Sequence, residues 1–181
     1  MGVTIPFASI AFPKLRLPLF EDGRFTATKF QSSADKAKFA NHLLRFMAAG
    51  FPQASFNKSF YSRLSMCFSH IAHYDQHGFW NNFFTSTEGR IEFIDQTLRG
   101  GGYGDPAWTF SDVELAVRKR VKEARMMEAY RQARAAEIVG AERELLRRLK
   151  AQYEPEPADN RSDVPVSAPV HRGPAVQLGL F

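Results

Sequence analysis

Three histidines come closest, by type and spacing, to the residues of an enzyme site. His70, His73 and His77 are separated by three and then four residues, so a helix running through them would place the imidazoles near one face. Three imidazoles can hold a zinc ion. The chain has no His-Glu-x-x-His pattern, however, and Gly78 is expected to end the helix beside His77. We therefore interpret the group as core or surface histidines, and a metal-dependent enzyme is the least favoured of three hypotheses.

Nothing else in the sequence indicates catalysis. The glycines of residues 100–104 lack the Gly-x4-Gly-Lys-Ser/Thr pattern of a phosphate-binding loop and are expected to follow a helix, so we interpret them as a hinge. The single cysteine, Cys67, excludes a disulfide framework and a cysteine-based zinc site, and its apolar helical surroundings predict a buried thiol. We expect no cofactor, and we favour a protein that is not an enzyme.

A basic cluster is the second candidate site. It lies in residues 111–152, a stretch of helical composition without proline in which Lys and Arg outnumber Asp and Glu. Such side chains could contact phosphates independently of base sequence and in a salt-sensitive way. The alternative is a solvated helix face, because acidic residues lie four positions from two of the basic ones. The cluster comprises Arg118, Lys119, Arg120, Lys122 and Arg125, with Arg131 and Arg134 beyond it.

The composition limits what can position these residues. A chain of 181 residues has room for one ordinary domain with extensions, and its 17 phenylalanines predict an aromatic core. The net charge of +5 favours a polyanionic partner without requiring one. Prolines interrupt the apolar N-terminus, which therefore does not resemble a signal peptide, and no apolar run approaches the roughly 20 residues that span a bilayer. We expect a cytoplasmic protein without a membrane partner.

The predicted fold class is mainly α with a small N-terminal β element, an α+β arrangement. Residues 1–30 alternate apolar and polar positions around a turn at Glu21–Gly23, and Arg24–Phe30 has β-favouring composition. The pattern changes to helical spacing over residues 32–99, where Ser32 or Ser33 and Ser86 are expected to cap helices.

Within this helical core we expect four helical segments. The first ends at Gly50, the second runs from about Ser55 to Tyr74, a short aromatic turn covers residues 79–84, and the last ends at Gly100. The core domain is assigned to residues 1–110.

One long basic helix is expected over residues 111–152. Ser111 and Glu114 fit a capping box at its start. The helix would be about 60 Å long. Its first half carries an apolar stripe that would pack on the core, whereas the weaker stripe of the second half would project or pair with another helix.

The last five residues, Gln177-Leu178-Gly179-Leu180-Phe181, form a compact apolar group with one amide in front. Their neighbours in sequence are Pro, Gly, Ala, Val and Arg, which cannot bury two leucines and a phenylalanine. The group therefore needs a groove, on its own protein or on another. The preceding residues 153–176 hold five prolines and no apolar period, and we expect a disordered linker there.

The terminal pentapeptide resembles the motif by which bacterial replication, repair and mobile-element proteins dock on the β sliding clamp. That motif reads Gln-Leu-small-Leu-Phe and commonly lies at a chain terminus or on a linker. The resemblance covers five residues, of which four match in type, and Gly179 is a small variant. It implies that Gln177 hydrogen-bonds at the rim of the clamp pocket. It further implies that Leu180 and Phe181 fill the main apolar pocket and that Leu178 occupies the adjoining groove.

A second stretch, Arg16-Leu17-Pro18-Leu19-Phe20, repeats the Leu-x-Leu-Phe spacing with Arg in place of Gln. Because it lies in a predicted strand, we interpret it as part of the core rather than as a second docking peptide.

Three functional hypotheses follow, in order of preference. The first is a non-catalytic protein, associated with the replisome or nucleoid, that docks on the clamp in DNA replication or repair, or competes there as a product of a mobile element. The second is a DNA-binding accessory protein that uses the basic helix while its tail docks internally. The third is the histidine-based metalloenzyme. The oligomeric state stays open.

Overall fold

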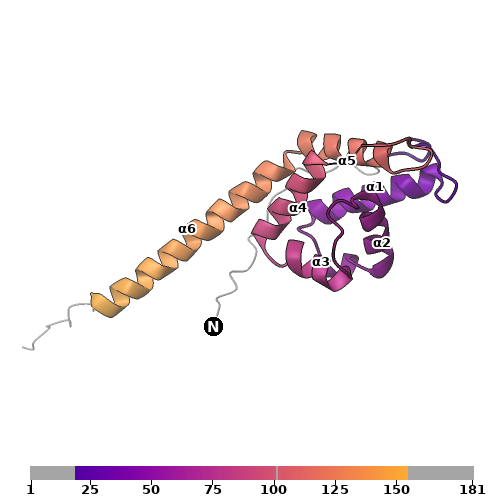
Figure 1. Cartoon of the computed structure of the whole chain (residues 1–181). Coiled ribbons are helices and arrows are strands. Elements are labelled where there is room, and N and C mark those ends of the chain that lie inside the picture. Colours follow the sequence, from indigo (N-terminus) through magenta and orange to yellow (C-terminus); the bar gives the residue numbers. More distant parts are fainter. Residues whose placement is uncertain (1–18, 101, 155–181) are drawn as a thin grey trace, which may run out of the picture. The chain divides into compact units, whose positions relative to one another are not determined.

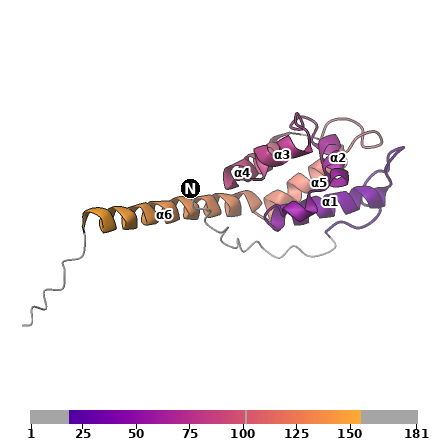
Figure 2. The same ribbon diagram turned by 90° about the horizontal axis from the view of Figure 1, so that it is seen from below.

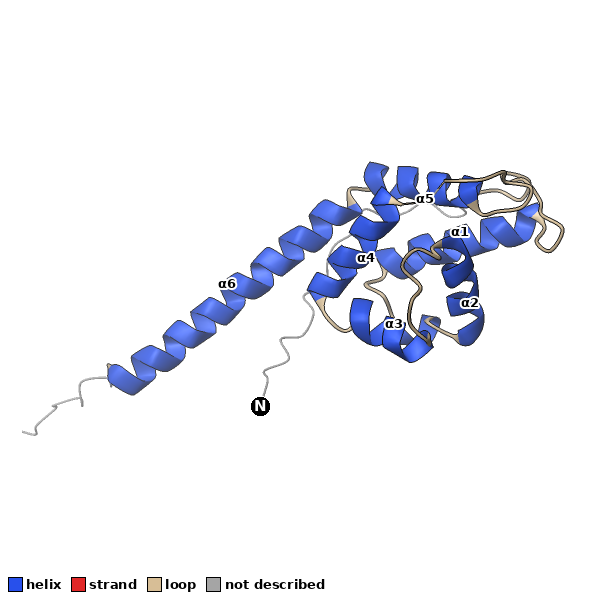
Figure 3. Ribbon diagram, viewed as in Figure 1, coloured by secondary structure: helices blue, strands red, loops and turns tan. Residues whose placement is uncertain are grey.

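The structure, a computed structural model, describes residues 19–100 and 102–154, and the regular elements in these residues are all helical (Figure 3). The mainly helical class is therefore confirmed. In chain order the elements are α1 (Ser33–Ala48), the short 3-10 helix η1 (Gln53–Ser55), α2 (Lys58–Cys67), α3 (Gln76–Phe83), α4 (Thr87–Arg99), α5 (Ser111–Glu123) and α6 (Met126–Tyr153).

The β element expected over residues 1–30 is wrong for its described part, which contains turns and bends but no strand. The backbone there is hydrogen-bonded within its own turns and to side chains. The amide of Thr26, for example, donates to the carboxylate of Asp112 at 2.8 Å. β-favouring composition reflects packing on a sheet, and Arg24–Phe30 has no partner strand among the described residues. The expected strands before Leu19 lie outside the described residues.

The helix starts expected from serine caps are confirmed at two places. The hydroxyl of Ser32 accepts from the amide of Asp35 at 3.1 Å, and the carboxylate of Asp35 accepts from the amide of Ser32, which completes a capping box at the start of α1. The hydroxyl of Ser86 accepts from the amide of Gly89 at 3.0 Å and caps α4. A compact helical core over residues 32–99 is therefore present as predicted.

The helix expected from Ser55 to Tyr74 is shorter than its apolar spacing indicates. It begins after the cap residue Asn57, as α2, and ends at Cys67, beyond which the chain turns. A new helix, α3, begins at Gln76 with Asp75 as its cap. Gly78 therefore lies in the first turn of α3 rather than at the end of the preceding helix. Phe68 and Ile71 lie in the turn and are buried there, so the helical spacing of apolar residues continues in the sequence past the end of the helix.

The single helix expected over residues 111–152 is two helices, α5 and α6. Between them Arg125 adopts a left-handed backbone conformation with φ of 49°. This turn allows Met126, Met127 and Tyr130, at the start of α6, to be buried, and the hydroxyl of Tyr130 donates to the carbonyl of Met47 at 2.6 Å. No glycine or proline marks the break, so the sequence carries no local signal for it.

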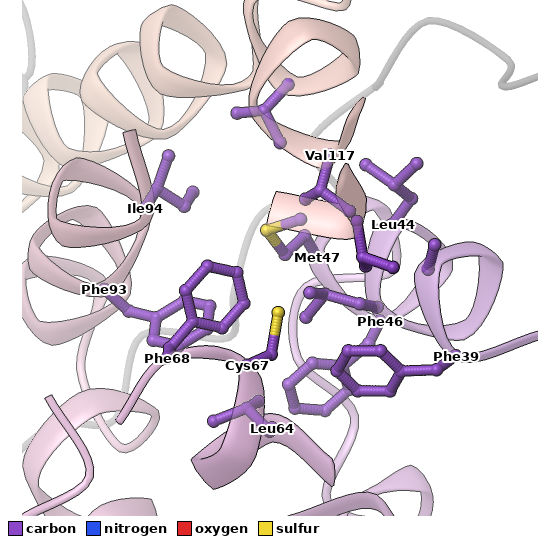
Figure 4. Close-up of a cluster of buried hydrophobic side chains, with 14 of the residues drawn as sticks. Phe39, Leu44, Phe46, Met47, Leu64, Cys67, Phe68, Phe93, Ile94 and Val117 are labelled. Carbon is purple, nitrogen blue, oxygen red and sulfur yellow. The ribbon is translucent and has the colours of Figure 1, made fainter. Parts of the chain in front are cut away.

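The core is a cluster of phenylalanines enclosed by α1–α5 and the start of α6 (Figures 1 and 4). In Figure 2, α1 and α5 lie on one side and α2, α3 and α4 on the other. Phe84 is fully buried at the centre, and its ring centroid lies 4.8 Å from that of Phe51 and 5.1 Å from that of Phe93. These separations are within the favourable range for aromatic pairs. The predicted aromatic core is confirmed.

The compact unit ends at Arg143, inside α6, and the chain from Glu144 onward is a separate unit. In that second unit the described residues are helical to Tyr153, and Leu145, Leu146 and Leu149 are exposed. None of the described helices combines the length and the apolar character that crossing a membrane requires.

Candidate functional site

The three histidines do not form a shared face, because the helix that would align them ends at Cys67. His70 and His73 lie in the turn between α2 and α3, His77 lies in α3, and all three side chains are exposed. The imidazole of His70 packs against Gly100, where an added Cβ would come within 2.4 Å of its Nε2 atom. Across the described residues, no group of three or more His, Cys, Asp or Glu side chains is placed to hold a metal ion.

The basic cluster is brought together on α5 and the following turn, but part of its charge is neutralised. Lys119 and Arg120 both face Glu123, with nitrogen–oxygen distances of 3.9 and 3.1 Å, so the expected pairing of Lys119 with Glu123 is present. Lys122 and Arg125 are exposed, and neither forms an ion pair with another described residue. Fewer residues of the cluster are therefore available to an outside anion than the sequence indicates.

Beyond the cluster, Arg131 is exposed, whereas Arg134 interacts with acidic groups. One of its terminal nitrogens lies 3.5 Å from the carboxylate of Glu88 and the other 3.4 Å from that of Glu137. Glu137 also accepts from the hydroxyl of Thr87 at 2.5 Å. Arg134 thus helps to hold the first part of α6 to the start of α4.

Two side chains interpreted as core residues are confirmed. Phe20, the end of the second Leu-x-Leu-Phe stretch, is buried, and its amide and carbonyl both bond to the side-chain amide of Asn41 at 2.9 Å. Cys67 is buried, and burial raises the pKa of its thiol well above the usual value. A thiol in this state is a poor nucleophile at neutral pH.

The structure gathers three exposed aromatic side chains around one groove, which the sequence does not reveal. Phe30 is 82% exposed, Tyr103 is 87% exposed and Trp108 is 74% exposed. The groove has a volume of about 700 Å³, with buried Cys67 and Phe110 in its lining. We call it the aromatic groove. Its full lining is Thr28, Phe30, Gln31, Met66, Cys67, Ser69, His70, Gly100, Tyr103, Trp108, Thr109, Phe110 and Glu114.

A buried lysine holds the loop that carries Trp108. The side chain of Lys36 is fully buried, and its ammonium donates to the carbonyls of Pro106 and Thr109 at 2.9 and 2.8 Å and to Asp112 at 3.1 Å. Each of the three N–H donors of the ammonium thus has an acceptor, which a buried charged group requires. The same ammonium lies 5.4 Å from the ring centre of Phe110. This arrangement fixes the loop to both α1 and α5.

The glycine-rich loop is packed, so the hinge interpretation does not fit its described residues. Gly102 and Gly104 have φ of +83° and +89°, a backbone conformation that favours glycine, and a Cβ at either would come within 2.9 Å of a neighbouring side chain. The amide of Gly102 donates to the carboxylate of Glu114, and the hydroxyl of Ser111 donates to the carbonyl of Gly104 at 2.9 Å. Ser111 and Glu114 thus hold this loop instead of forming the expected capping box.

Glu114 is the only carboxylate among the described residues that line the groove. Burial raises its pKa, while the hydrogen bond from Gly102 and the nearby charges of His70 and Arg118 act in the opposite direction. No lysine or arginine occurs among the described residues that line the groove. The groove is therefore aromatic, preorganised and nearly uncharged, which makes it suited to an apolar ligand and unsuited to phosphates.

One of the missed residues carried a usable signal. Lys36 precedes Ala40, Leu43 and Met47 at spacings of four, three and four, so it lies in register with the buried face of α1. A charged residue at a core-facing position indicates a buried ion pair. The gathering of the three exposed rings had no such signal, because they come from two segments more than 70 positions apart in sequence.

The clamp-binding motif and the linker expected before it lie outside the described residues, apart from Tyr153 and Glu154. No protein-family model, curated protein sequence or solved structure matches this chain.

Proposed function

We propose that this protein docks on the bacterial replication sliding clamp through residues 177–181 and that it acts there without catalysis. The observation that carries the proposal is the sequence Gln177-Leu178-Gly179-Leu180-Phe181, in which the types and order of four residues match those of clamp-binding peptides. The proposal does not depend on a particular activity of the helical core.

The physical chemistry of short peptide binding supports this assignment. A peptide that orders on binding must concentrate its energy in a few large anchors, because each ordered residue costs conformational entropy. Burying a leucine or a phenylalanine contributes about 1.5–3 kcal/mol each. Two leucines and one phenylalanine, with the amide of Gln177 at the rim, therefore suit binding in the micromolar range.

The length of chain before the motif is compatible with docking at a distance from the core. Residues 154–176 separate α6 from the motif, and a chain of that length can span at most about 80 Å. The clamp would thus recruit the helical core to replicating DNA, or the motif would exclude polymerases that need the same pocket. Both outcomes use the same five residues.

The direct test is binding of the full chain to a purified bacterial sliding clamp by calorimetry. Gln177→Ala is expected to weaken binding about tenfold, since it removes hydrogen bonds at the pocket rim, and removal of Leu180 and Phe181 is expected to abolish it. Gln152→Ala is the matched control, because Gln152 is an exposed glutamine on α6. Unchanged affinity in both motif variants would refute clamp docking through this peptide.

A second candidate function, DNA binding through α5, is favoured by the exposed side chains of Lys122 and Arg125. Each can give one salt-sensitive phosphate contact. Reversing both charges to Glu is expected to weaken binding to double-stranded DNA and to lower the steepness of its salt dependence. Reversing Lys119, which already faces Glu123, is expected to have a smaller effect. Equal DNA affinity in all three proteins would argue against this function.

A further inference from the structure

The aromatic groove combines three largely exposed aromatic rings with a loop that is held firmly in place. The loop that carries Tyr103 and Trp108 is held by hydrogen bonds from Lys36, Ser111 and Gly102. A loop fixed in this way presents its aromatic rings in a defined arrangement, which lowers the entropy lost when a ligand binds. Exposed aromatic patches beside a groove are typical of sites that bind an extended apolar segment.

The charge of the groove limits the chemistry of its occupant. Its described lining has one carboxylate, that of Glu114, which already accepts a hydrogen bond from Gly102. The ammonium of Lys29 lies 5.7 Å from the ring centre of Phe30 but is not part of the lining. An anionic occupant would lose its hydration there without gaining an ion pair, and a cationic occupant would find only the carboxylate of Glu114, which is already shared with Gly102. The groove therefore fits an uncharged segment with large apolar side chains.

The chain itself contains such a segment. Residues 1–13 include no ionisable side chain, and they carry Phe7, Ile10 and Phe12 among small residues and prolines. Burial of each phenylalanine would contribute about 1.5–3 kcal/mol. The two prolines, Pro6 and Pro13, disfavour a helix over these residues and favour an extended backbone. Composition and charge thus match the groove.

The length of the chain permits the contact. Phe20 is fixed to α1 through Asn41, and eight residues later the chain reaches the groove at Thr28. In the opposite direction, Phe12 is also eight residues from Phe20, so it has the same maximum reach. A tether this short gives a local concentration in the millimolar range.

We propose that residues 1–13 occupy the aromatic groove as an extended segment without charged side chains, whose phenylalanines pack on the exposed rings. This contact buries apolar surface of the segment and of the groove. The segment therefore competes for the groove with any peptide of the same chemistry from another protein. This inference goes beyond clamp docking and is independent of it, because it uses no residue after Glu114.

The test measures how well acrylamide quenches the fluorescence of Trp108 in the full chain, with Trp80→Phe so that only one tryptophan remains. In this parent protein Trp108 is expected to be shielded. Replacing both Phe7 and Phe12 by Ser is expected to raise the quenching constant severalfold. The matched control replaces Ala8 and Ala11 by Ser, which adds two hydroxyls to the same segment but removes no anchor, and it is expected to keep the shielding.

A second arm separates loss of the contact from loss of folding. A synthetic peptide of residues 1–13, added to the Phe7→Ser/Phe12→Ser chain, is expected to restore the shielding of Trp108, whereas the same peptide with both substitutions is not. Equal quenching in the parent and the double variant overturns the proposal, since the groove would then be open or filled by another segment. Shielding that grows with protein concentration overturns it in favour of a contact between two copies.

Discussion

Helices α5 and α6 follow one another with only Ala124 and Arg125 between them, and both are rich in charged residues, yet different interactions hold them. In α5 the side chains of Val113, Val117 and Val121 are at most 1% exposed. In α6 no described side chain after Tyr130 is buried. The two helices share a composition but not a source of stability.

The difference shows how far local interactions can define a helix. Beyond Glu137, the last α6 residue bonded to α4, the helix relies on residues of high helix propensity and on ion pairs within the helix, such as those from Glu144 to Arg147 and Arg148, both at 2.9 Å. Such pairs contribute a few tenths of a kcal/mol each, whereas burial of a valine contributes about 1.5–3 kcal/mol. We expect α5 to unfold only with the core, and the end of α6 to fray independently.

The largest expected effect comes from the centre of the aromatic core. Phe84→Ala removes a fully buried ring that contacts several others, and it should lower the free energy of unfolding by about 3–5 kcal/mol in urea titrations. Leu146→Ala, at a 55% exposed position of α6, should change it by less than about 0.5 kcal/mol. Similar losses in both variants would show that the end of α6 is held as tightly as the core.

Lys36→Met should rank close behind. The substitution leaves the carboxylate of Asp112 and two backbone carbonyls without their shared donor, and breaking a buried pair in this way costs about 3 kcal/mol. Lys38→Met, two positions along α1 and exposed, is the control and should be nearly neutral. Because Lys36 also holds the loop of Trp108, its replacement should increase hydrogen exchange at residues 105–110, and unchanged exchange there would contradict this role.

Tyr130→Phe tests where burial ends along α6. It removes the hydroxyl that donates to the carbonyl of Met47 and leaves that carbonyl with the longer hydrogen bond from the amide of Gly50 at 3.2 Å. Loss of the buried hydrogen bond should lower the free energy of unfolding by about 1 kcal/mol. Tyr153→Phe, at a 71% exposed position, should have no measurable effect. A neutral Tyr130→Phe would mean that the start of α6 is no better anchored than its end.

Arg125→Gly addresses the break between the two helices. Arg125 has φ of 49°, a conformation that costs a side-chain-bearing residue about 1 kcal/mol relative to glycine. The variant should therefore raise the midpoint of thermal unfolding slightly, whereas Ala124→Gly, at a position with ordinary φ, should lower it. A loss of stability in Arg125→Gly would indicate that α5 and α6 are continuous in solution.

The smallest effect is a pH dependence at the end of α6. Hydrogen bonds from Arg147 and Arg148 lower the pKa of Glu144 to about 2 from its usual value of 4.5. Because the folded pKa is the lower one, the stabilisation is present above the usual value and is lost as pH falls from about 4.5 toward about 2. Helix content by circular dichroism should be higher in the parent than in Glu144→Gln at pH 7, and the difference should shrink through this window.

Much of the helical core could be predicted from local patterns. The caps at Ser32 and Ser86 and the ends at Gly50 and Gly100 follow from hydrogen bonding within a few residues, and these are where the structure agrees with the sequence. The errors lie where the backbone depends on distant partners. Arg24–Phe30 has the composition of a strand, but the amide of Thr26 donates to Asp112 of α5 and the amide of Phe30 donates to the hydroxyl of Thr28 within a local turn.

The candidate sites divide in the same way. The basic cluster was visible because its five members lie within residues 118–125, although pairing of Lys119 and Arg120 with Glu123 reduces the number of basic side chains without an acidic partner. The histidines followed the correct spacing for a helix, but the helix stops at Cys67. The aromatic groove was not predicted, because a short sequence window contains no information about which rings a fold leaves exposed together.

The sequence by itself determined the mainly helical class, the helix starts at Ser32 and Ser86, the aromatic core, the buried Cys67 and the terminal pentapeptide on which clamp docking is proposed. Only the tertiary structure decided that Lys36 is buried against a loop 70 positions away, that the chain turns at Arg125, and that Phe30, Tyr103 and Trp108 border one groove. The physical reason is the range of the interactions: caps and helical periodicity act within one or two turns, whereas burial and ion pairing depend on which distant segments meet.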